Sequence, residues 1–114
     1  MSEANELQRV IEHYNSMVHQ NPDDIVWITN LAWSYERIGQ YQEAIREFRR
    51  ALDVNESDID AHYGLGLALL GDNQPQEALA QFVRARDFAM TESADRSKIA
   101  MLSKQVEVLI RRLS

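Results

Sequence analysis

With 114 residues, of which 45% are apolar and 26% charged, the chain has the composition of one soluble globular domain. Its formal net charge of −6 argues against sequence-independent binding to nucleic acid, which requires a positive surface. The sequence contains no cysteine, which excludes disulfides, thiol nucleophiles and cysteine-bound metals.

The start of the chain and its hydropathy give an expectation about location. Residues 1–6 are polar and acidic, unlike the basic and then apolar start of a secretion signal. No apolar stretch approaches the roughly 20 residues that span a bilayer. We therefore expect a cytoplasmic protein that does not insert into a membrane.

Apolar residues at steps of three and four predict a series of amphipathic helices. The first runs from residue 3 to about residue 19 and ends before Pro22, which cannot continue a helix. Asn21 or an aspartate after it is expected to cap the second helix, from about 24 to 38. Gly39 closes that helix, and a third runs from about 41 to 54.

Three further helices are predicted in the second half of the chain. The fourth starts after a sequence that resembles a capping box, Ser57 to Asp60, and ends near residue 70. Pro75 suits the first turn of the fifth helix, which ends near residue 90. The last helix runs from about 92 to 112, and every connection is short, as antiparallel helix pairs require.

The sequence repeats itself at an interval of 34 residues. The superposed pairs are Leu31 and Leu65, Glu43 and Glu77, Ala44 and Ala78, Phe48 and Phe82, Arg50 and Arg84, Ala51 and Ala85, and Asp53 and Asp87. A fixed period of this size is typical of a stacked-repeat architecture.

Two helices in 34 residues, with small residues at fixed places, resemble the tetratricopeptide repeat. The residues that carry the resemblance are Leu31, Ala32, Tyr35, Gly39, Tyr41, Ala44, Phe48 and Ala51 in the first copy, and Leu65, Gly66, Leu69, Ala78, Phe82 and Ala85 in the second. Val10, Tyr14, Met17 and Pro22 match the second half of a preceding repeat. The resemblance implies an all-α fold of antiparallel helix-turn-helix repeats stacked in a right-handed superhelix.

The resemblance also implies a domain organisation. We expect one domain over residues 1–114, with a half repeat at 1–22, full repeats at 25–58 and 59–92, and a capping helix at 93–114. The last segment alternatively opens a further repeat.

In this family the first helix of each repeat lines a concave groove that typically holds a peptide or helix of another protein. The residues that map to this groove are Val26, Thr29, Asn30, Trp33, Arg37, Tyr63, Leu67, Leu70 and Met101. The resemblance therefore implies a non-enzymatic protein–protein interaction module without a cofactor.

Trp33 is expected to be exposed in the groove. It lies six residues from Trp27, about 240° around a helix, so the two tryptophans cannot face one core stripe. With Tyr63, Leu67 and Met101 it would form an apolar strip. Such a strip indicates a partner surface, unless a neighbouring helix of the same chain covers it.

One version of the groove binds the carboxylate tail of heat-shock chaperones through lysines, asparagines and an arginine. Only Asn30 matches that set here, and the other positions hold Val26, Trp33, Asp60, Tyr63 and Gly64. The resemblance thus implies an apolar and aromatic groove rather than a carboxylate clamp.

The last predicted helix is apolar on two sides. Its main stripe contains Ile99, Leu102, Val106, Leu109, Ile110 and Leu113, and Met101 and Val108 project to nearly the opposite side. An end cap is expected to be polar on its outer face. An alternative function is therefore a self-associating structural subunit that oligomerises through its terminal helices, although one stripe could equally seal the last repeat while Met101 completes the groove.

The sequence gives no indication of catalysis or metal binding. The three histidines form no i, i+4 pair, and neither a glycine-flanked nucleophile nor a phosphate-binding glycine loop is present. Arg46, Arg49 and Arg50 are expected to form a solvated face that pairs with Glu43 and Glu47.

Overall fold

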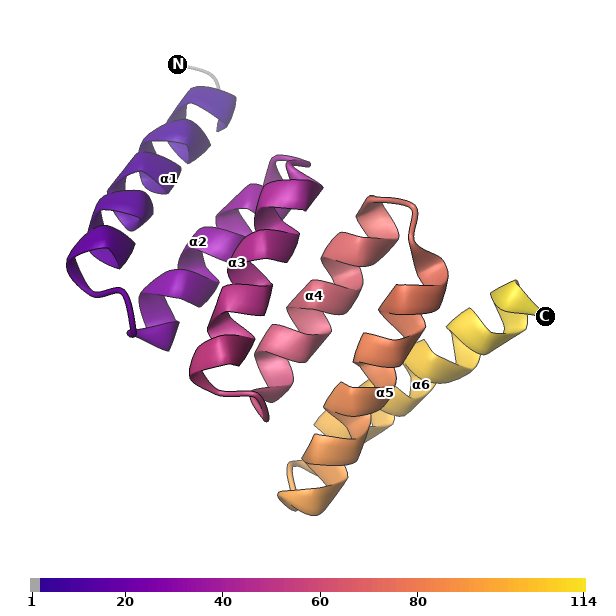
Figure 1. The fold of residues 1–114 in the computed structure, drawn as a ribbon. Helices are drawn as coiled ribbons and strands as arrows, with labels where there is room; N and C mark the ends of the chain where they lie inside the picture. The colour runs from indigo at the N-terminus through magenta and orange to yellow at the C-terminus, as the bar shows by residue number, and fades with distance from the viewer. Residues whose placement is uncertain (1–2) are drawn as a thin grey trace.

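The computed structural model describes residues 3–114, and within this range every regular element is an α-helix (Figure 1). The helices are α1 (Glu3–Gln20), α2 (Ile25–Arg37), α3 (Tyr41–Val54), α4 (Ile59–Gly71), α5 (Pro75–Thr91) and α6 (Arg96–Leu113). Each helix packs against the next one along the chain, and α2 also contacts α4. The predicted all-α stack of helix pairs is confirmed.

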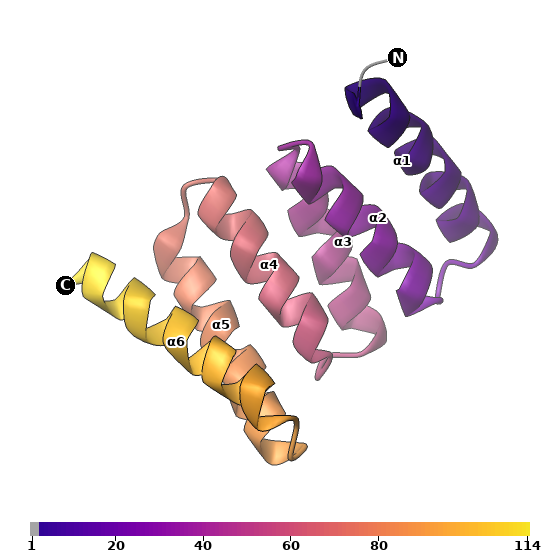
Figure 2. The ribbon, with the colours of Figure 1, turned by 180° about the vertical axis from the view of Figure 1, so that it is seen from behind.

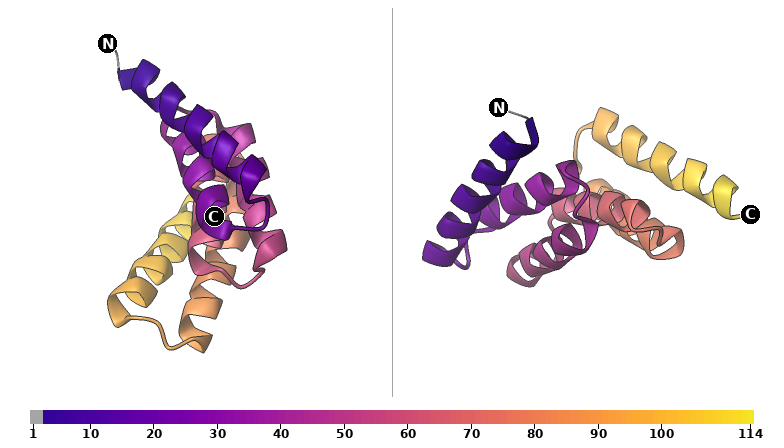
Figure 3. Two further views of the ribbon diagram at one scale, coloured as in Figure 1. Left: turned by 90° about the vertical axis from the view of Figure 1, so that its left-hand side faces the viewer. Right: turned by 90° about the horizontal axis from the view of Figure 1, so that it is seen from above.

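The helices form two rows in an elongated molecule of 40 × 27 × 22 Å. Seen from behind, α2, α4 and α6 lie toward the viewer, and α3 and α5 lie behind them (Figure 2). The view from above shows α1 and α6 at opposite ends of the stack (Figure 3, right). The face made by α2, α4 and α6 is called the first-helix face below.

An aspartate caps the start of α2, of α4 and of α6. The Asp24 carboxylate accepts a hydrogen bond from the Val26 N–H at 3.0 Å. Asp58 and Asp95 do the same for α4 and α6, at 2.8 and 2.9 Å. The capping box predicted at Ser57 is therefore wrong in its first residue, because Ser57 donates its hydroxyl to Asn55 Oδ1 and Asp58 is the cap.

A residue with a positive φ lies two positions after the end of α2, α4 and α5. This conformation lets the backbone N–H groups of the turn bond to the last carbonyl groups of the helix. Gly39, Asn73 and Ser93 have φ values of 77°, 63° and 54° and follow α2, α4 and α5. The turn at Ser93 occupies residues 92–95, so α6 starts at Arg96. The predicted start of the last helix near residue 92 is therefore wrong. The sequence does not reveal the turn, because serine seldom adopts a positive φ.

The core depends on two phenylalanines that pack against α4 from its two sides. Phe48 and Phe82 are both 0% exposed. The ring of Phe48 lies against Gly64, and a Cβ atom added to Gly66 would lie 2.6 Å from Cε1 of Phe82. Since such a distance is too short for two carbon atoms, α4 can approach both rings only with glycine at these positions.

We predict that Gly66→Ala lowers the free energy of unfolding by about 1–3 kcal/mol, because the added methyl group overlaps the Phe82 ring. The higher helix propensity of alanine opposes this loss by only about 1 kcal/mol. Denaturant unfolding measures the change. In a Phe82→Leu background the cost should shrink, and an equal cost in both backgrounds would contradict the contact.

The two repeats differ at two equivalent positions, whose side chains are hydrogen-bonded to each other in the second repeat. In the second repeat His62 places Nδ1 2.8 Å from Gln81 Oε1 and Nε2 2.7 Å from the Glu56 carbonyl oxygen. The residues 34 positions earlier are Ile28 and Glu47. Glu47 is 7% exposed, and its Oε2 makes no hydrogen bond within residues 3–114.

We predict that Glu47→Leu raises the free energy of unfolding by about 1 kcal/mol. It removes a buried carboxylate whose Oε2 lacks a hydrogen bond and whose ion pairs with Arg46 and Arg50 are long, at 3.9 and 3.8 Å. The matched change in the second repeat, Gln81→Leu, should lower it by about 1 kcal/mol, because His62 loses a partner. Thermal and denaturant unfolding measure both. A loss of stability in Glu47→Leu would show that the carboxylate is needed.

Candidate functional site

The predicted site residues come from the three helices of the first-helix face. Five lie on α2, three on α4 and one on α6: Val26, Thr29, Asn30, Trp33 and Arg37, then Tyr63, Leu67 and Leu70, then Met101. Their spacing of three and four residues places them on one side of each helix. The contact of α2 with α4 brings Trp33 and Tyr63 together, with ring centroids 6.3 Å apart.

The aromatic side chains of this face rest on the core phenylalanines. Trp33 meets Phe48 edge to face, at a centroid distance of 5.1 Å and an interplanar angle of 82°. Tyr63 packs on Phe82 at 5.8 Å. The same contacts that hold the repeats together therefore fix the positions of the two aromatic residues.

The structure corrects the expectation that Trp33 is exposed, since both tryptophans are half-buried. Trp27 packs against α1, where its ring centroid lies 6.0 Å from that of Tyr14 and 6.1 Å from that of His13. Trp33 packs on the opposite side of α2. The helix has neighbours on two sides, so two side chains about 240° apart can both be partly buried.

The remaining site residues differ in the exposed fraction of their side chains. Val26 is 59% exposed and Met101 is 38% exposed. Leu67 and Leu70 are half-buried against the core. The hydroxyl of Thr29 donates to the Ile25 carbonyl of its own helix at 2.8 Å.

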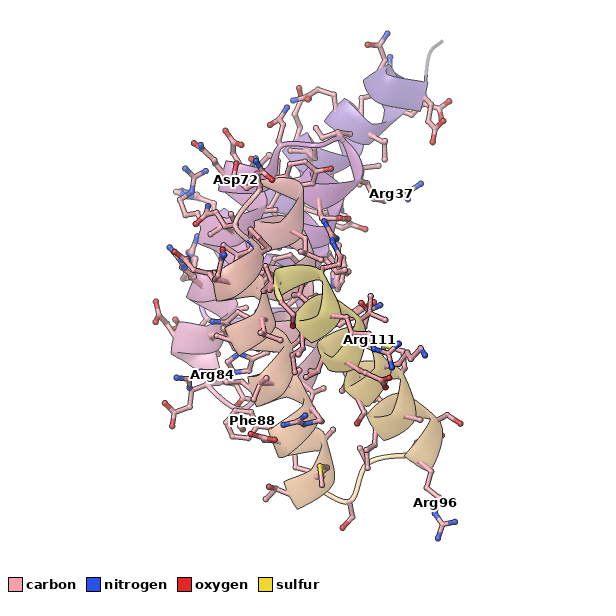
Figure 4. The ribbon with its side chains drawn as sticks, turned by 90° about the vertical axis from the view of Figure 1, so that its right-hand side faces the viewer. Arg37, Asp72, Arg84, Phe88, Arg96 and Arg111 are labelled. Atoms are coloured by element: carbon pink, nitrogen blue, oxygen red, sulfur yellow. The ribbon has the colours of Figure 1, made fainter. Side chains whose placement is uncertain are left out.

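Charged side chains flank this apolar strip. Lys98 of α6 and Asp60 of α4 form an ion pair at 3.0 Å, and Arg37 lies 3.9 Å from Glu3. Figure 4 shows Arg37 and Arg111 on one side of the molecule, and Asp72 and Arg84 on the other. The ion pair between Lys98 and Asp60 ties α6 to α4 at the start of both helices.

A cavity that the sequence did not predict lies between α3 and the turn from α4 to α5. It has a volume of about 670 Å3 and is lined by Gln42, Ile45, Arg46, Arg49, Arg50, Asp53, Asp72, Gln74 and Glu77. The nearest carboxylate oxygens lie 3.7–3.9 Å from the three guanidinium groups. The helical spacing of the arginines gave a signal for a shared face, but the opposing turn could not be placed from sequence.

Residues 3–114 contain neither a membrane-spanning helix nor a metal-binding cluster. No helix in this range is both long and apolar enough to cross a membrane. Nor does any group of three or more histidine, aspartate or glutamate side chains in the described part of the chain have the arrangement needed to hold a metal ion.

Sequence comparison identifies relatives. A family model described as tetratricopeptide repeat matches residues 29–92. The small glutamine-rich tetratricopeptide repeat-containing protein 2 of Mycosarcoma maydis is 29% identical over 79 residues. That match covers 69% of this chain and 22% of the relative, so the chain spans less than a quarter of the length of that protein.

Structural comparison gives matches that extend over almost the whole chain. PcrH, solved in complex with the chaperone binding region of PopD, has a TM-score of 0.90 at 14% identity, covering 98% of this chain and 84% of that one. The Yersinia enterocolitica type III secretion translocator chaperone SycD, in an alternative dimer, has a TM-score of 0.88 at 12% identity and covers 98% and 85%. The first TPR of Spaghetti (RPAP3), bound to the HSP90 peptide SRMEEVD, has a TM-score of 0.81 at 19% identity and covers 97% and 82%. At these identities the matches establish the fold.

We predict that Trp33→Ala lowers the free energy of unfolding by about 2 kcal/mol, because it removes an indole packed on Phe48 and Tyr63. Val26→Ala, at a side chain that is 59% exposed, should change it by less than about 0.5 kcal/mol. Chemical denaturation of the two variants gives the comparison. Equal stability of both variants would mean that Trp33 contributes nothing to the core.

Proposed function

The chain belongs to the tetratricopeptide repeat family, and we propose that it is a non-enzymatic module that binds a peptide or helix of another protein in a groove along the first-helix face. The observation that supports this most directly is the apolar strip across α2, α4 and α6. It combines the exposed Val26 and Met101 with the half-buried Trp33, Tyr63 and Leu67. Apolar patches of this kind on soluble proteins commonly mark partner surfaces.

The strip favours a ligand with apolar anchor residues. Trp33 and Tyr63 are held by the core, so they lose little conformational entropy when a partner covers them. Aromatic side chains in such settings contribute a large part of the binding energy. The amide of Asn30, half-buried beside them, can hydrogen-bond the backbone of the ligand.

The charges around the strip argue against a ligand recognised mainly through a terminal carboxylate. The domain of Spaghetti was solved with the acidic HSP90 peptide SRMEEVD. In this chain Val26, Trp33 and Tyr63 occupy positions that a carboxylate clamp would fill with basic or amide side chains. Two cations that flank the strip, Lys98 and Arg37, already lie beside the carboxylates of Asp60 and Glu3. We therefore propose an internal, amphipathic segment of the partner as the ligand.

The proposal also covers chemistry and location. We propose no enzymatic activity and no cofactor, because the sequence has neither a glycine-flanked nucleophile nor a phosphate-binding glycine loop. We further propose that the module acts in the cytoplasm, in keeping with the absence of cysteine.

Peptide display against the immobilised chain tests the groove directly. We expect selected peptides to contain apolar residues at helical or alternating spacing, and Val26→Glu or Met101→Glu to weaken their binding by about tenfold or more. Both positions are exposed, at 59% and 38%, so the variants should fold normally.

Met90→Glu is the matched control, because Met90 is 57% exposed but lies on α5, outside the first-helix face. It should leave the affinity within about twofold of the wild type. Titration calorimetry gives the affinities. Peptides that bind both groove variants as tightly as the wild type would overturn the assignment of the groove.

A further inference from the structure

Helix α1 has the residue pattern of the second helix of a repeat, but the residues of that pattern are less buried in α1 than in α3 and α5. In α3 the residues Ala44, Phe48 and Ala51 are all 0% exposed, and so are Ala78, Phe82 and Ala85 in α5. The residues 34 positions before those of α3 are Val10, Tyr14 and Met17. Val10 is 37% exposed and the other two are half-buried. Among the described residues, α1 packs against α2 alone.

Helix α6 carries the pattern of a first helix, at an interval of 37 residues from α4. Its start at Arg96 and its cap at Asp95 lie 37 residues after Ile59 and Asp58. At this interval Leu102 and Val106 correspond to Leu65 and Leu69, and all four are buried. The three extra residues lie in α5, which has 17 residues where α3 has 14.

The position of the small residue is the same in all three first helices. Ala32, Gly66 and Ser103 occupy it in α2, α4 and α6. In the complete pair of α4 and α5, a Cβ atom on Gly66 would lie 2.6 Å from the Phe82 ring. Ala32 is 0% exposed and Gly66 is buried, whereas Ser103 is only half-buried. Ser103 is thus as small as a residue that packs against an aromatic ring of the second helix of its repeat. It is less buried than such a residue, which the ring covers.

The charges of the two terminal helices are complementary. α1 carries three acidic side chains and one arginine, with Glu3 and Glu6 in its first turn. α6 carries five basic side chains and one glutamate, with Arg111 and Arg112 in its last turn. Antiparallel pairing, as in the other helix pairs, would place the acidic start of α1 beside the basic end of α6.

We propose that α6 of one copy of this chain packs antiparallel against α1 of a second copy, so that the two helices complete a third helix pair. Tyr14 of the second copy takes the place that Phe48 and Phe82 have in the other pairs, over Ser103 of the first. This interface is formed by the two terminal helices and does not depend on ligand binding to the apolar strip. Val10 and Met17 are larger than the alanines they replace, so the helices pair less closely and the association is reversible.

The contact is heterologous, because each copy presents a different surface at each end. Assembly therefore does not stop at a dimer, and the row formed by α2, α4 and α6 continues into α2 of the next copy. The weight-average mass in solution should rise with concentration above that of two chains, and added salt should lower it.

Two variants, each altered at one edge, provide the test. Val10→Glu changes the α1 edge, and Ile110→Glu changes the α6 edge, where Ile110 is 50% exposed and lies seven residues after Ser103 on the same side. Each variant alone should remain at the chain mass of 13.2 kDa. An equimolar mixture retains one intact edge of each kind, and it should reach twice that mass and go no further.

Analytical ultracentrifugation over a roughly hundredfold range of concentration gives the masses, and circular dichroism melting establishes that the variants fold. Val54→Glu on α3, 41% exposed, is the matched control and should associate like the wild type. A wild type that stays monomeric at every concentration, a mixture that stays monomeric, or variants that assemble alone would overturn the proposal.

Discussion

The structure depends on how closely α4 approaches the two core phenylalanines. Phe48 and Phe82 belong to different helix pairs, and each packs on a glycine of α4, at Gly64 and Gly66. These contacts join the two repeats into one unit and fix the distances of α3 and α5 from α4. Trp33 packs on Phe48, and Tyr63 packs on Phe82. The first-helix face is therefore a direct extension of the core, and its rigidity has the same origin.

The internal period predicted the parts of the fold that repeat, and missed those where the chain departs from it. Residues 25–91 followed from the period because caps, small residues and phenylalanines recur together. The start of α6 did not, because Ser93 with a φ of 54° occupies a turn that glycine or asparagine fills elsewhere. The environment of Trp33 was also missed. A helix with neighbours on two sides has two buried stripes, and a single sequence does not reveal how many neighbours a helix has.

The two broad faces of the molecule are chemically different although the same repeats build both. The first-helix face is apolar, with its main ion pair between Asp60 and Lys98 at one end. The opposite face holds the arginine-lined cavity, whose charges are balanced by nearby carboxylates at 3.7–3.9 Å. Charge pairs at such distances and exposures contribute little to stability. Covering the apolar face therefore releases more free energy than covering the charged one, because it removes more apolar surface from water. For this reason the ligand site is proposed on the first-helix face.

Ligand binding and self-association would both use α6, but on different sides of the helix. Met101 is the α6 residue of the apolar strip, while Ser103 and Ile110, on another side of the helix by its periodicity, would meet α1 of a second copy. Because a second copy adds its own α2 to the row, a ligand long enough to cross the junction would contact both copies. Such a ligand binds the assembled form more tightly than the single chain, and by linkage it must promote assembly to the same extent. A ligand short enough to lie on one copy leaves the association unchanged, so the length of the ligand decides whether the two functions are coupled.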